Sequence, residues 1–295
     1  MSVLVIGSCM MDHTAKTSRF PEPGEAVRGH SFGVFPGGKG INQAVAAKRL
    51  GSDVFFFGAV GDDAYGYRFL SILEKEGINH EGVLVVPGET TGASLIPLDE
   101  KTGQNRIICC PGANLSLEGD DLKDREDIFE QVSLVMVQLE TAVPTVLEAA
   151  KLAKKHKKLF ILNPAPAETL PDEIFPMVDY FTPNETEAFF YSGKEDPAAA
   201  AKEILKKGVK NVIVTLGDKG CLFANGKEII RLPALRVKAV DTVGAGDVFN
   251  GAIAFSLDRG ISIGRALKIA IYASAMSVTK PGALASIPTL EELMK

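Results

Sequence analysis

The segment Asp241–Gly251 carries the residue types best suited to chemistry. It reads Asp-Thr-Val-Gly-Ala-Gly-Asp-Val-Phe-Asn-Gly and precedes an apolar, helix-like run, Ala252–Leu257. A glycine-rich turn that opens a helix presents backbone N–H groups, and the helix dipole adds to their attraction for an anion. An acidic residue there would repel an anion, so Asp247 is better explained as a general base for an attacking hydroxyl. An aspartate in the first turn of a helix also commonly caps it, and this segment alone leaves both roles open.

A second glycine-rich segment, Gly33–Gly40, nearly matches a phosphate-binding P-loop. It has Gly40 where that motif needs a Ser or Thr hydroxyl for Mg²⁺, and Pro36 lies inside the loop. Glycines allow close approach of the backbone, and an amide supplies both a donor and an acceptor. Lys39 and Asn42 are therefore candidates for contact with a small polyhydroxylated ligand. An ordinary helix-capping turn is the alternative.

Five motifs extend along most of the chain. They are Gly37-Gly38-Lys39-Gly40-Ile41-Asn42, Asn163-Pro164-Ala165-Pro166, Pro183-Asn184-Glu185-Thr186-Glu187, Thr215-Leu216-Gly217-Asp218-Lys219-Gly220 and Asp241-Thr242-Val243-Gly244-Ala245-Gly246-Asp247. In this order they closely resemble the motifs of the ribokinase-like (PfkB-type) sugar kinases. Gln138-Leu139-Glu140 matches the ribokinase branch as well.

This resemblance implies transfer of a phosphoryl group from ATP to a sugar. Asp247 would deprotonate the sugar's primary hydroxyl, and the backbone N–H groups of the preceding turn would form an anion hole for the phosphoryl group. The anion-hole residues are Gly244, Ala245 and Gly246. The residues implied to bind the sugar are Met10, Asp12, Gly38, Lys39, Gly40, Ile41, Asn42 and Glu140. Asp12 and Glu140 each follow a predicted strand, where parallel α/β sheets bind ligands.

The same resemblance implies sites for the nucleotide, for Mg²⁺ and for a monovalent cation. Asn184 and Glu187 would organise Mg²⁺ and the phosphates, partly through water; a helix cap and a solvated acid are the alternatives. The nucleotide site would comprise Asn184, Glu187, Thr215, Leu216, Gly217, Asp218, Lys219, Gly220, Gly246 and, near the adenine, Ile271. Potassium, the family's usual ion, would bind at Asp241, Val243, Ser277, Lys280, Gly282 and Ser286, with only the backbone carbonyl of Val243, Lys280 and Gly282 involved.

Alternating strands and helices must position these residues. Short apolar runs predict buried strands at Val3–Ile6, Val54–Phe57, Val132–Val137, Leu159–Leu162, Tyr180–Thr182 and Val212–Thr215. Amphipathic stretches predict helices at Asn42–Leu50, Tyr65–Glu76, Val146–His156 and Ala198–Lys207, three of them followed by a glycine. The alternation predicts an α/β fold with a largely parallel sheet and helices on both faces.

Two regions break the alternation, residues 13–36 and 92–110. The second reads as a β-hairpin with its turn at Asp99–Gly103. Both are too small to be domains, so we expect a single kinase domain over residues 1–295 with these pieces as a small β-sheet lid. In ribokinase-like enzymes lid strands often pair across a dimer. The apolar edge Ile107–Cys110 of this hairpin therefore predicts a homodimer.

Composition narrows the classes of partner. The chain has 295 residues, of which 46% are hydrophobic and 23% charged, as expected for a globular protein that folds on its own. Its formal net charge of -5 provides no general attraction for nucleic acid. Four scattered cysteines without a Cys-x-x-Cys pair fit the cytoplasm. The N-terminal residues lack a basic leader, and no stretch approaches ~18 apolar residues, so we expect no membrane partner.

One departure from the family pattern concerns the substrate. Many ribokinases carry Asn two residues before the first sugar-binding Asp, where this chain has Met10. Methionine cannot replace the amide's hydrogen bonds to a hydroxyl. Relatives with Met at this position include both ribose and 2-deoxyribose kinases, so the choice of pentose stays open at this point.

Three classes of function compete. A dinucleotide oxidoreductase would need Gly-x-Gly-x-x-Gly after the first strand, which this sequence lacks. A non-catalytic sugar-binding protein would be expected to lose the base at Asp247. A kinase agrees with all five motifs. We therefore expect ATP-dependent phosphorylation of the 5-hydroxyl of D-ribose, with a 2-deoxyribose kinase or another sugar or nucleoside kinase of the same fold as the alternative.

Overall fold

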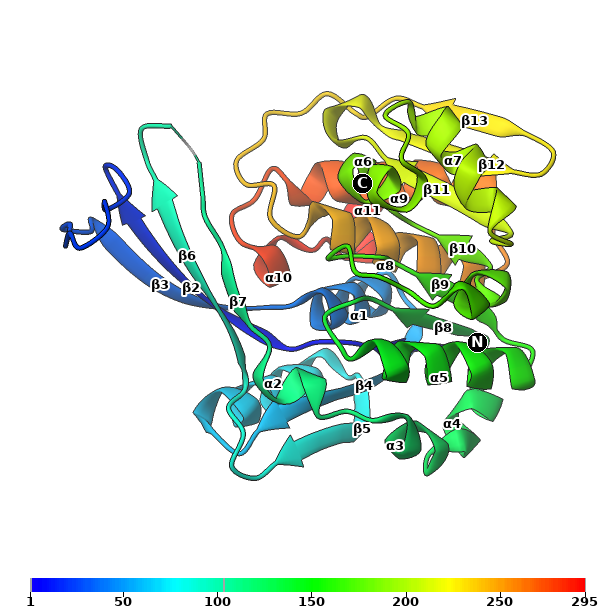
Figure 1. The fold of residues 1–295 in the computed structure, drawn as a ribbon, viewed down its shortest axis with the longest axis horizontal. Coiled ribbons are helices and arrows are strands. Elements are labelled where there is room, and N and C mark those ends of the chain that lie inside the picture. The colour runs from blue at the N-terminus through cyan, green and yellow to red at the C-terminus, as the bar shows by residue number, and fades with distance from the viewer. Residues whose placement is uncertain (1, 103, 295) are drawn as a thin grey trace.

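Two β-sheets organise the chain in the computed structural model, which describes residues 2–102 and 104–294 (Figure 1). The larger sheet has nine strands in the order β13-β12-β11-β10-β9-β8-β1-β4-β5. Its strands from β11 to β5 are parallel, and β12 and β13 form an antiparallel edge. The strands are β1 Ser2–Ile6, β4 Asp53–Gly61, β5 Asn79–Val86, β8 Leu134–Val137, β9 Leu159–Leu162, β10 Tyr180–Phe181, β11 Asn211–Thr215, β12 Cys221–Asn225 and β13 Ile229–Leu232.

Helices cover both faces of the larger sheet, and a separate apolar core lies under each layer. Strands β1 and β8 are buried along their whole length, which explains their continuous apolar sequence. One face is covered by α1 Lys39–Arg49, α2 Ala64–Glu76, α8 Ala245–Asp258 and α9 Ile263–Ser277. The other is covered by α3 Gly119–Lys123, α4 Glu126–Gln131, α5 Val143–Lys155, α6 Glu185–Ser192 and α7 Pro197–Lys206. The predicted α/β fold is confirmed.

Most predicted helices are present, and their starts differ more than their ends. Helix α1 begins at Lys39, three residues before the predicted Asn42, so that Asn42 lies in its first turn. Helix α5 begins at Val143 rather than Val146, because Pro144 occupies its first turn, where a missing N–H costs nothing. Two short helices, α10 Ala283–Ser286 and α11 Leu290–Leu293, complete the C-terminal part. Among the described residues, no helix combines the length and the apolar character needed to cross a bilayer.

The smaller sheet projects from the side of the larger one, at the left of Figure 1. Its order is β3-β2-β6-β7, with β2 and β6 parallel and the outer pairs antiparallel. The predicted hairpin is present, since β6 and β7 pair with Ala93 opposite Cys110; Gly103 of its predicted turn lies outside the described residues. The strands are β2 Met10–Thr17, β3 Ser31–Gly37, β6 Gly92–Asp99 and β7 Ile108–Cys110.

The strand order reverses at β1, which has β4 on one side and β8 on the other. In parallel α/β sheets, ligands bind at the carboxyl ends of the strands where the order reverses. The chain leaves β1 directly into the smaller sheet and returns through β3 into α1. This topology brings the start of α1, the loop after β8 and the smaller sheet to one place.

Candidate active site

Asp247 lies near the start of α8, and its carboxylate is bound by the side chains of another helix. Asn42 Nδ2 donates to Asp247 Oδ2 at 3.0 Å, and Gln43 Nε2 donates to Oδ1 at 3.0 Å. Gly244, and not Asp247, is the N-cap of α8. The alternative that Asp247 serves as an ordinary helix cap is therefore not what the structure shows.

The charges around Asp247 form a mixed cluster. Burial raises the pKa of Asp247 above its usual value, although the Lys39 ammonium and the two amide donors act in the opposite direction. Burial alone would lower the pKa of Lys39, but the carboxylates of Asp247, Glu140 and Glu187 outweigh it and raise that pKa. These mutual effects show that side chains from α1, α6, α8 and the loop after β8 meet at one site.

The glycine-rich start of α1 packs directly on the loop after β1. A Cβ at Gly40 would lie 2.3 Å from the backbone N of Ser8, so only glycine fits there. Glu140 Oε2 accepts hydrogen bonds from Lys39 N at 2.9 Å and from the Ser8 hydroxyl. Glu140 therefore serves as a cap for α1 with one oxygen. Among the described residues Oε1 accepts no hydrogen bond and is free for a ligand hydroxyl.

The start of α8 has the geometry of an anion site. Gly244 has φ 78°, a left-handed conformation that favours glycine and turns the chain into the helix. No described atom lies within 4 Å of the position that a Cβ on Gly246 would take, so the space in front of this turn is open. The N–H of Ala245 donates to Thr242 O at 3.3 Å. The remaining N–H groups of the first turn and the helix dipole can meet an anion.

Asp12 lies within strand β2 and not after a strand of the larger sheet, so the expected position of this residue was wrong. The smaller sheet itself thus contributes a carboxylate to the site. Asp12 Oδ2 lies against Gly37, where a Cβ would come within 2.5 Å of it. Burial raises the pKa of Asp12 to about 6; Glu140 and Asp247 add to the rise, and a hydrogen bond with Ser94 opposes it.

Met10 is buried at the start of β2, between Gly37 of β3 and Gly92 of β6. Its sulfur lies 3.2 Å from Nδ2 of Asn114, a fully buried amide that also bonds both backbone groups of Cys9. The thioether is therefore enclosed by Asn114 and by the backbone of the smaller sheet, at the sequence position where the resemblance predicts an amide.

Asn184 and Glu187 form a capping box at the start of α6. Asn184 Oδ1 accepts from Glu187 N at 2.8 Å, and Glu187 Oε2 accepts from Asn184 N at 2.8 Å. The first alternative, a helix cap, is therefore present at Asn184, whereas the second, a solvated acid, is wrong for Glu187, which is buried. Burial raises the pKa of the Glu187 carboxyl. The Lys39 ammonium lowers this pKa and the Asp247 carboxylate raises it, so the Glu187 carboxylate faces the charged cluster around Asp247. A buried carboxylate beside the predicted phosphate site suits Mg²⁺ that is held partly through water.

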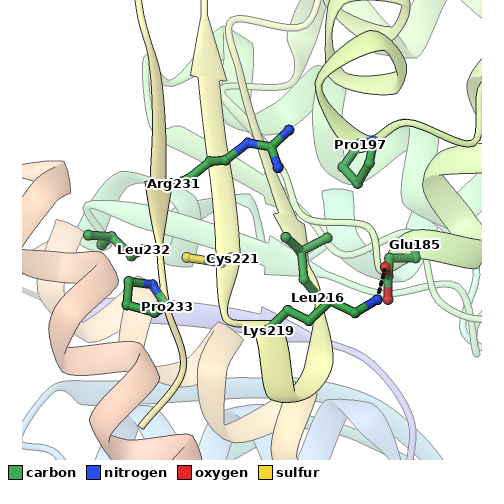
Figure 2. A pocket seen from close by; sticks show the side chains of 8 residues that line it. All are labelled: Glu185, Pro197, Leu216, Lys219, Cys221, Arg231, Leu232 and Pro233. Carbon is green, nitrogen blue, oxygen red and sulfur yellow. Dashed lines mark hydrogen bonds and ion pairs between the residues drawn. The ribbon is translucent and has the colours of Figure 1, made fainter.

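The predicted nucleotide segment connects β11 with β12, and Thr215 pairs with Asn184 in a parallel bridge. Two of its residues, Leu216 and Lys219, line a cavity of about 400 Å³, and Lys219 Nζ lies 3.4 Å from Glu185 (Figure 2). Ile271 is buried in α9, in the same core as Cys221. The remaining lining residues of the cavity are Pro197, Cys221, Arg231, Leu232 and Pro233.

The residues predicted to bind potassium lie on the loop before α8, on the loop after α9 and in the adjoining helices, with Ser277 the last residue of α9 and Ser286 the last of α10. Asp241 joins the two loops, because Oδ1 accepts from Val243 N at 3.0 Å and Oδ2 accepts from Gly282 N at 2.9 Å. Among the described residues, the carbonyls of Val243 and Lys280 accept no hydrogen bond. Such a set of oxygen atoms fits a hard monovalent cation. Ser277 and Ser286 donate their hydroxyls to Ser274 O and Ala283 O, both at 2.8 Å. No group of three or more His, Cys, Asp or Glu suited to a metal occurs in the described part of the chain.

Sequence reasoning assigned no site role to Gln43, Ser8 or Asn114. Gln43 and Asn114 are fully buried and bind, respectively, the base and the backbone at the start of the smaller sheet. A signal was available for Gln43, since two amides follow Ile41 in a helix that is otherwise small and apolar, and fully buried amides are uncommon. Asn114 is separated from its partners by 105 positions, and nothing in its local sequence indicates the contact.

Comparison with known proteins places the chain in one family. A family model described as pfkB family carbohydrate kinase matches residues 1–290. The ribokinase of Lactococcus lactis is 42% identical over 99% of this chain and 95% of its own length, and the deoxyribokinase of Salmonella typhimurium is 37% identical over 99% and 97%. The structure of Arabidopsis thaliana ribokinase complexed with ribose and ATP is similar with a TM-score of 0.93 at 30% identity, covering 99% of this chain and 97% of that one. With a family model matched over residues 1–290 and a buried aspartate, Asp247, in the first turn of α8, the chain belongs to the pfkB family of carbohydrate kinases.

Proposed function

We propose that this protein phosphorylates D-ribose at its 5-hydroxyl with ATP, giving D-ribose 5-phosphate and ADP. The observation that carries the proposal is the carboxylate of Asp247, which is bound by Asn42 and Gln43 beside the open turn of α8. The ribokinase and deoxyribokinase relatives match over nearly the whole chain, and a similar structure contains ribose and ATP. Together they support a pentose as the acceptor.

One group of site residues binds the sugar. The Gly38–Asn42 segment, with Asp12 and Glu140, binds the sugar hydroxyls. Asn42 Oδ1 is buried without a hydrogen-bond partner among the described residues, which suits acceptance of a hydroxyl proton. The Gly38–Asn42 segment includes Lys39 and Ile41, and the remaining sugar-binding position is Met10.

Proton transfer and phosphoryl transfer then occur at the start of α8. Asp247 takes the proton of the sugar's 5-hydroxyl while the oxygen of that hydroxyl attacks the γ-phosphorus of ATP. The bond between the γ-phosphorus and the β–γ bridging oxygen breaks, and ADP leaves. Of the three residues assigned to the anion hole, Gly244 and Gly246 stabilise the negative charge on the transferring group through their N–H groups. The N–H of Ala245, the third, donates to Thr242 O at 3.3 Å and must exchange this contact for the phosphoryl group. The electrostatic benefit is large because the donors of Gly244 and Gly246 are fixed before the reaction starts.

The nucleotide and metal sites complete the proposal. ATP lies along Thr215–Gly220 with its phosphates toward Asn184, and its adenine near Ile271. Asn184 and Glu187 would hold Mg²⁺, partly through water, and this ion would neutralise phosphate charge. Asp241 and its neighbouring carbonyls would hold potassium, which would stabilise the loop before α8.

The smaller sheet serves as a lid within a single kinase domain, since it contributes Met10 and Asp12 to the sugar site. We place the activity in the cytoplasm, where ATP is available and thiols stay reduced, which suits the four unpaired cysteines of this chain.

A second candidate, phosphorylation of 2-deoxyribose, is favoured by Met10 alone. Its thioether offers no hydrogen bond of the kind an amide gives to a 2-hydroxyl. A panel of ribose, 2-deoxyribose, fructose and nucleosides, each assayed for ADP formation with ATP, tests both candidates. We expect the highest kcat/KM for ribose and appreciable turnover of 2-deoxyribose. A preference for 2-deoxyribose would make the second candidate correct, and no turnover of either pentose would contradict both.

A further inference from the structure

Gln43 links the base to a chain of buried amides. Its Nε2 donates to Asp247 Oδ1 and to Asn163 Oδ1, each at 3.0 Å. Its Oε1 accepts from Nε2 of Gln138 at 2.7 Å. Asn163 in turn donates through Nδ2 to the backbone oxygen of Thr182 at 2.9 Å. The side chain of Gln43 is thereby fixed from three sides, by the residues that directly follow β8 and β9 and by α8.

The partners allow only one orientation of the Gln43 amide. If its oxygen and nitrogen were exchanged, the oxygen would face two acceptors, the carboxylate of Asp247 and Oδ1 of Asn163. The nitrogen would then face the Nε2 donor of Gln138. Every one of these contacts would become repulsive. The amide chain therefore always presents an N–H group, and never an oxygen, to Asp247.

Gln43 contacts Asp247 from the protein interior, and both polar atoms of its side chain are bound by protein groups. Asn42, which binds the other oxygen of Asp247, is also buried, but its Oδ1 has no hydrogen-bond partner among the described residues and it lies in the predicted sugar site. We propose that Gln43 is a positioning residue that fixes the orientation of the Asp247 carboxylate and keeps it ionised for proton transfer. This inference rests on the proposed function, since it assigns how the base of that reaction is held.

The other charges at the site do not replace this contact. Lys39, Glu140, Asp12 and Glu187 are the charged groups that interact with Asp247, and three of the four are carboxylates. The three carboxylates oppose ionisation of Asp247, and burial of Asp247 opposes it as well. The N–H donated by Gln43 therefore acts on the same side as Lys39 and Asn42, and its removal should make Asp247 easier to protonate.

Two substitutions test the role by the pH dependence of kcat. Gln43→Met keeps the length of the side chain and removes the donor, and Gln43→Asn stays polar but is one methylene too short to reach Asp247. With either variant we expect the acidic limb of the kcat profile to move upward by about one pH unit, a tenfold change in proton affinity. At the plateau kcat should fall by about tenfold, while KM for ribose stays within about twofold.

A double-mutant cycle separates positioning from general loss of stability. In the Asp247→Asn background, where no base remains, Gln43→Met should change the residual kcat by less than about twofold, because residues that act through one another are not additive. Gln43→Met deletes three buried hydrogen bonds. Ser52→Ala serves as a control for loss of buried hydrogen bonding away from the start of α8, since it deletes the 3.0 Å contact to Asp258 at the other end of that helix. It should lower the melting temperature and leave the acidic limb in place.

The outcomes distinguish this inference from the proposed function. If the unchanged protein does not phosphorylate ribose, the proposed function is wrong. If it does, the inference is overturned when the acidic limb of both Gln43 variants coincides with that of the unchanged protein, when KM rises instead of kcat falling, or when Gln43→Met lowers kcat as much without Asp247 as with it. The role of Gln43 as a positioning residue would be established by two results together. The acidic limb of the kcat profile moves upward in both Gln43 variants, and Gln43→Met no longer lowers kcat in the Asp247→Asn background.

Discussion

At residue 247 the carboxylate accepts two amide donors from helix α1 instead of capping helix α8. This arrangement predicts the effect of Asp247→Asn, which keeps the shape of the side chain and removes the base. General-base catalysis contributes ~10²–10⁴-fold, so kcat should fall by about that factor while ribose binding is largely retained. Steady-state kinetics with a parallel titration of ribose binding checks it. Near-normal turnover would remove Asp247 from its role.

The raised pKa of Asp12, about 6, predicts a pH-dependent stability. Because the folded protein binds this proton more tightly than the unfolded chain, the associated stability is present below pH 4 and is lost as pH rises through 6. Asp12→Asn removes the ionised form. We expect its melting temperature to exceed that of the unchanged apoprotein at pH 8, by about 2–4 °C for each kcal/mol recovered, and to match it at acidic pH. Equal melting temperatures at pH 8 would contradict the raised pKa.

Met10 tests the choice of pentose. An unpaired hydroxyl in a closed site costs ~1–3 kcal/mol, and ribose has a 2-hydroxyl that 2-deoxyribose lacks. If the thioether of Met10 faces C2, Met10→Asn should raise the ratio of kcat/KM for ribose over 2-deoxyribose by ~5- to 150-fold. Gly92 and Asn114 already enclose the side chain, so the amide would be confined to the same position. An unchanged ratio would show that residue 10 does not contact C2.

At the scale of elements, the two loops joined by Asp241 support the start of α8. Ser274 of α9 donates to Ala245 O at 2.8 Å, and Asp241 binds Gly282 N, so a cation at these loops would influence the anion site without touching substrate. Potassium added to ion-free enzyme should raise the rate by about fivefold or more. Asp241→Asn should abolish this response. A rate of the unchanged enzyme that does not depend on potassium concentration would contradict a cation site at these loops.

Elements with continuous apolar runs could be located from the sequence, but not all of their limits were correct: β4 extends to Gly61, four residues past the predicted Phe57, and β8 begins at Leu134 rather than Val132. Strand β9 has the predicted limits Leu159–Leu162, and helix α2 differs by one residue at its start. Helix α1 was placed too late because its first turn contains no apolar stripe: Lys39 and Gly40 are bound by Glu140 and Ser8, which are distant in sequence. The local pattern of apolar residues indicates helix propensity and burial, but it does not indicate caps that are supplied by residues distant in the sequence.

The site could be predicted as a set of residues but not as a set of contacts. The family motifs supplied Asp247, Asn42 and Glu140, and the fold brings them to one edge of the sheet. The contact of Gln43 with Asp247 joins positions 204 apart and depends on how α1 packs against α8. Asp12 was expected after the first strand and before the lid segment at residue 13, whereas β2 begins at Met10, so the smaller sheet starts earlier than predicted and includes Asp12.

At the scale of the whole molecule, the smaller sheet exposes an unusual amount of apolar surface. The large exposed side chains on or beside it are Phe32, Phe35, Leu95, Ile107 and Ile108. Strand β7 is also an open edge with unpaired backbone groups. Monomers rarely leave such a patch uncovered, so we predict a homodimer through this sheet.

Light scattering at micromolar concentration checks the prediction. The unchanged protein should have a mass near twice 31.4 kDa, and Ile108→Glu should shift it toward the monomer because a charge would be buried at the dimer edge. A single species of 31.4 kDa for the unchanged protein would contradict the dimer.

The position of the phosphate on the product tests the central claim most directly. The purified protein is incubated with ATP and ribose, and the sugar product is identified by ³¹P and ¹³C NMR, with 5-deoxyribose as the matched control that lacks the attacking hydroxyl. The arrangement of Asp247, the α8 turn and the sugar-binding start of α1 predicts ribose 5-phosphate and ADP in equal amounts, and no phosphorylation of 5-deoxyribose. ATP hydrolysis without a sugar phosphate, a phosphate on another hydroxyl, or turnover of 5-deoxyribose would contradict the account.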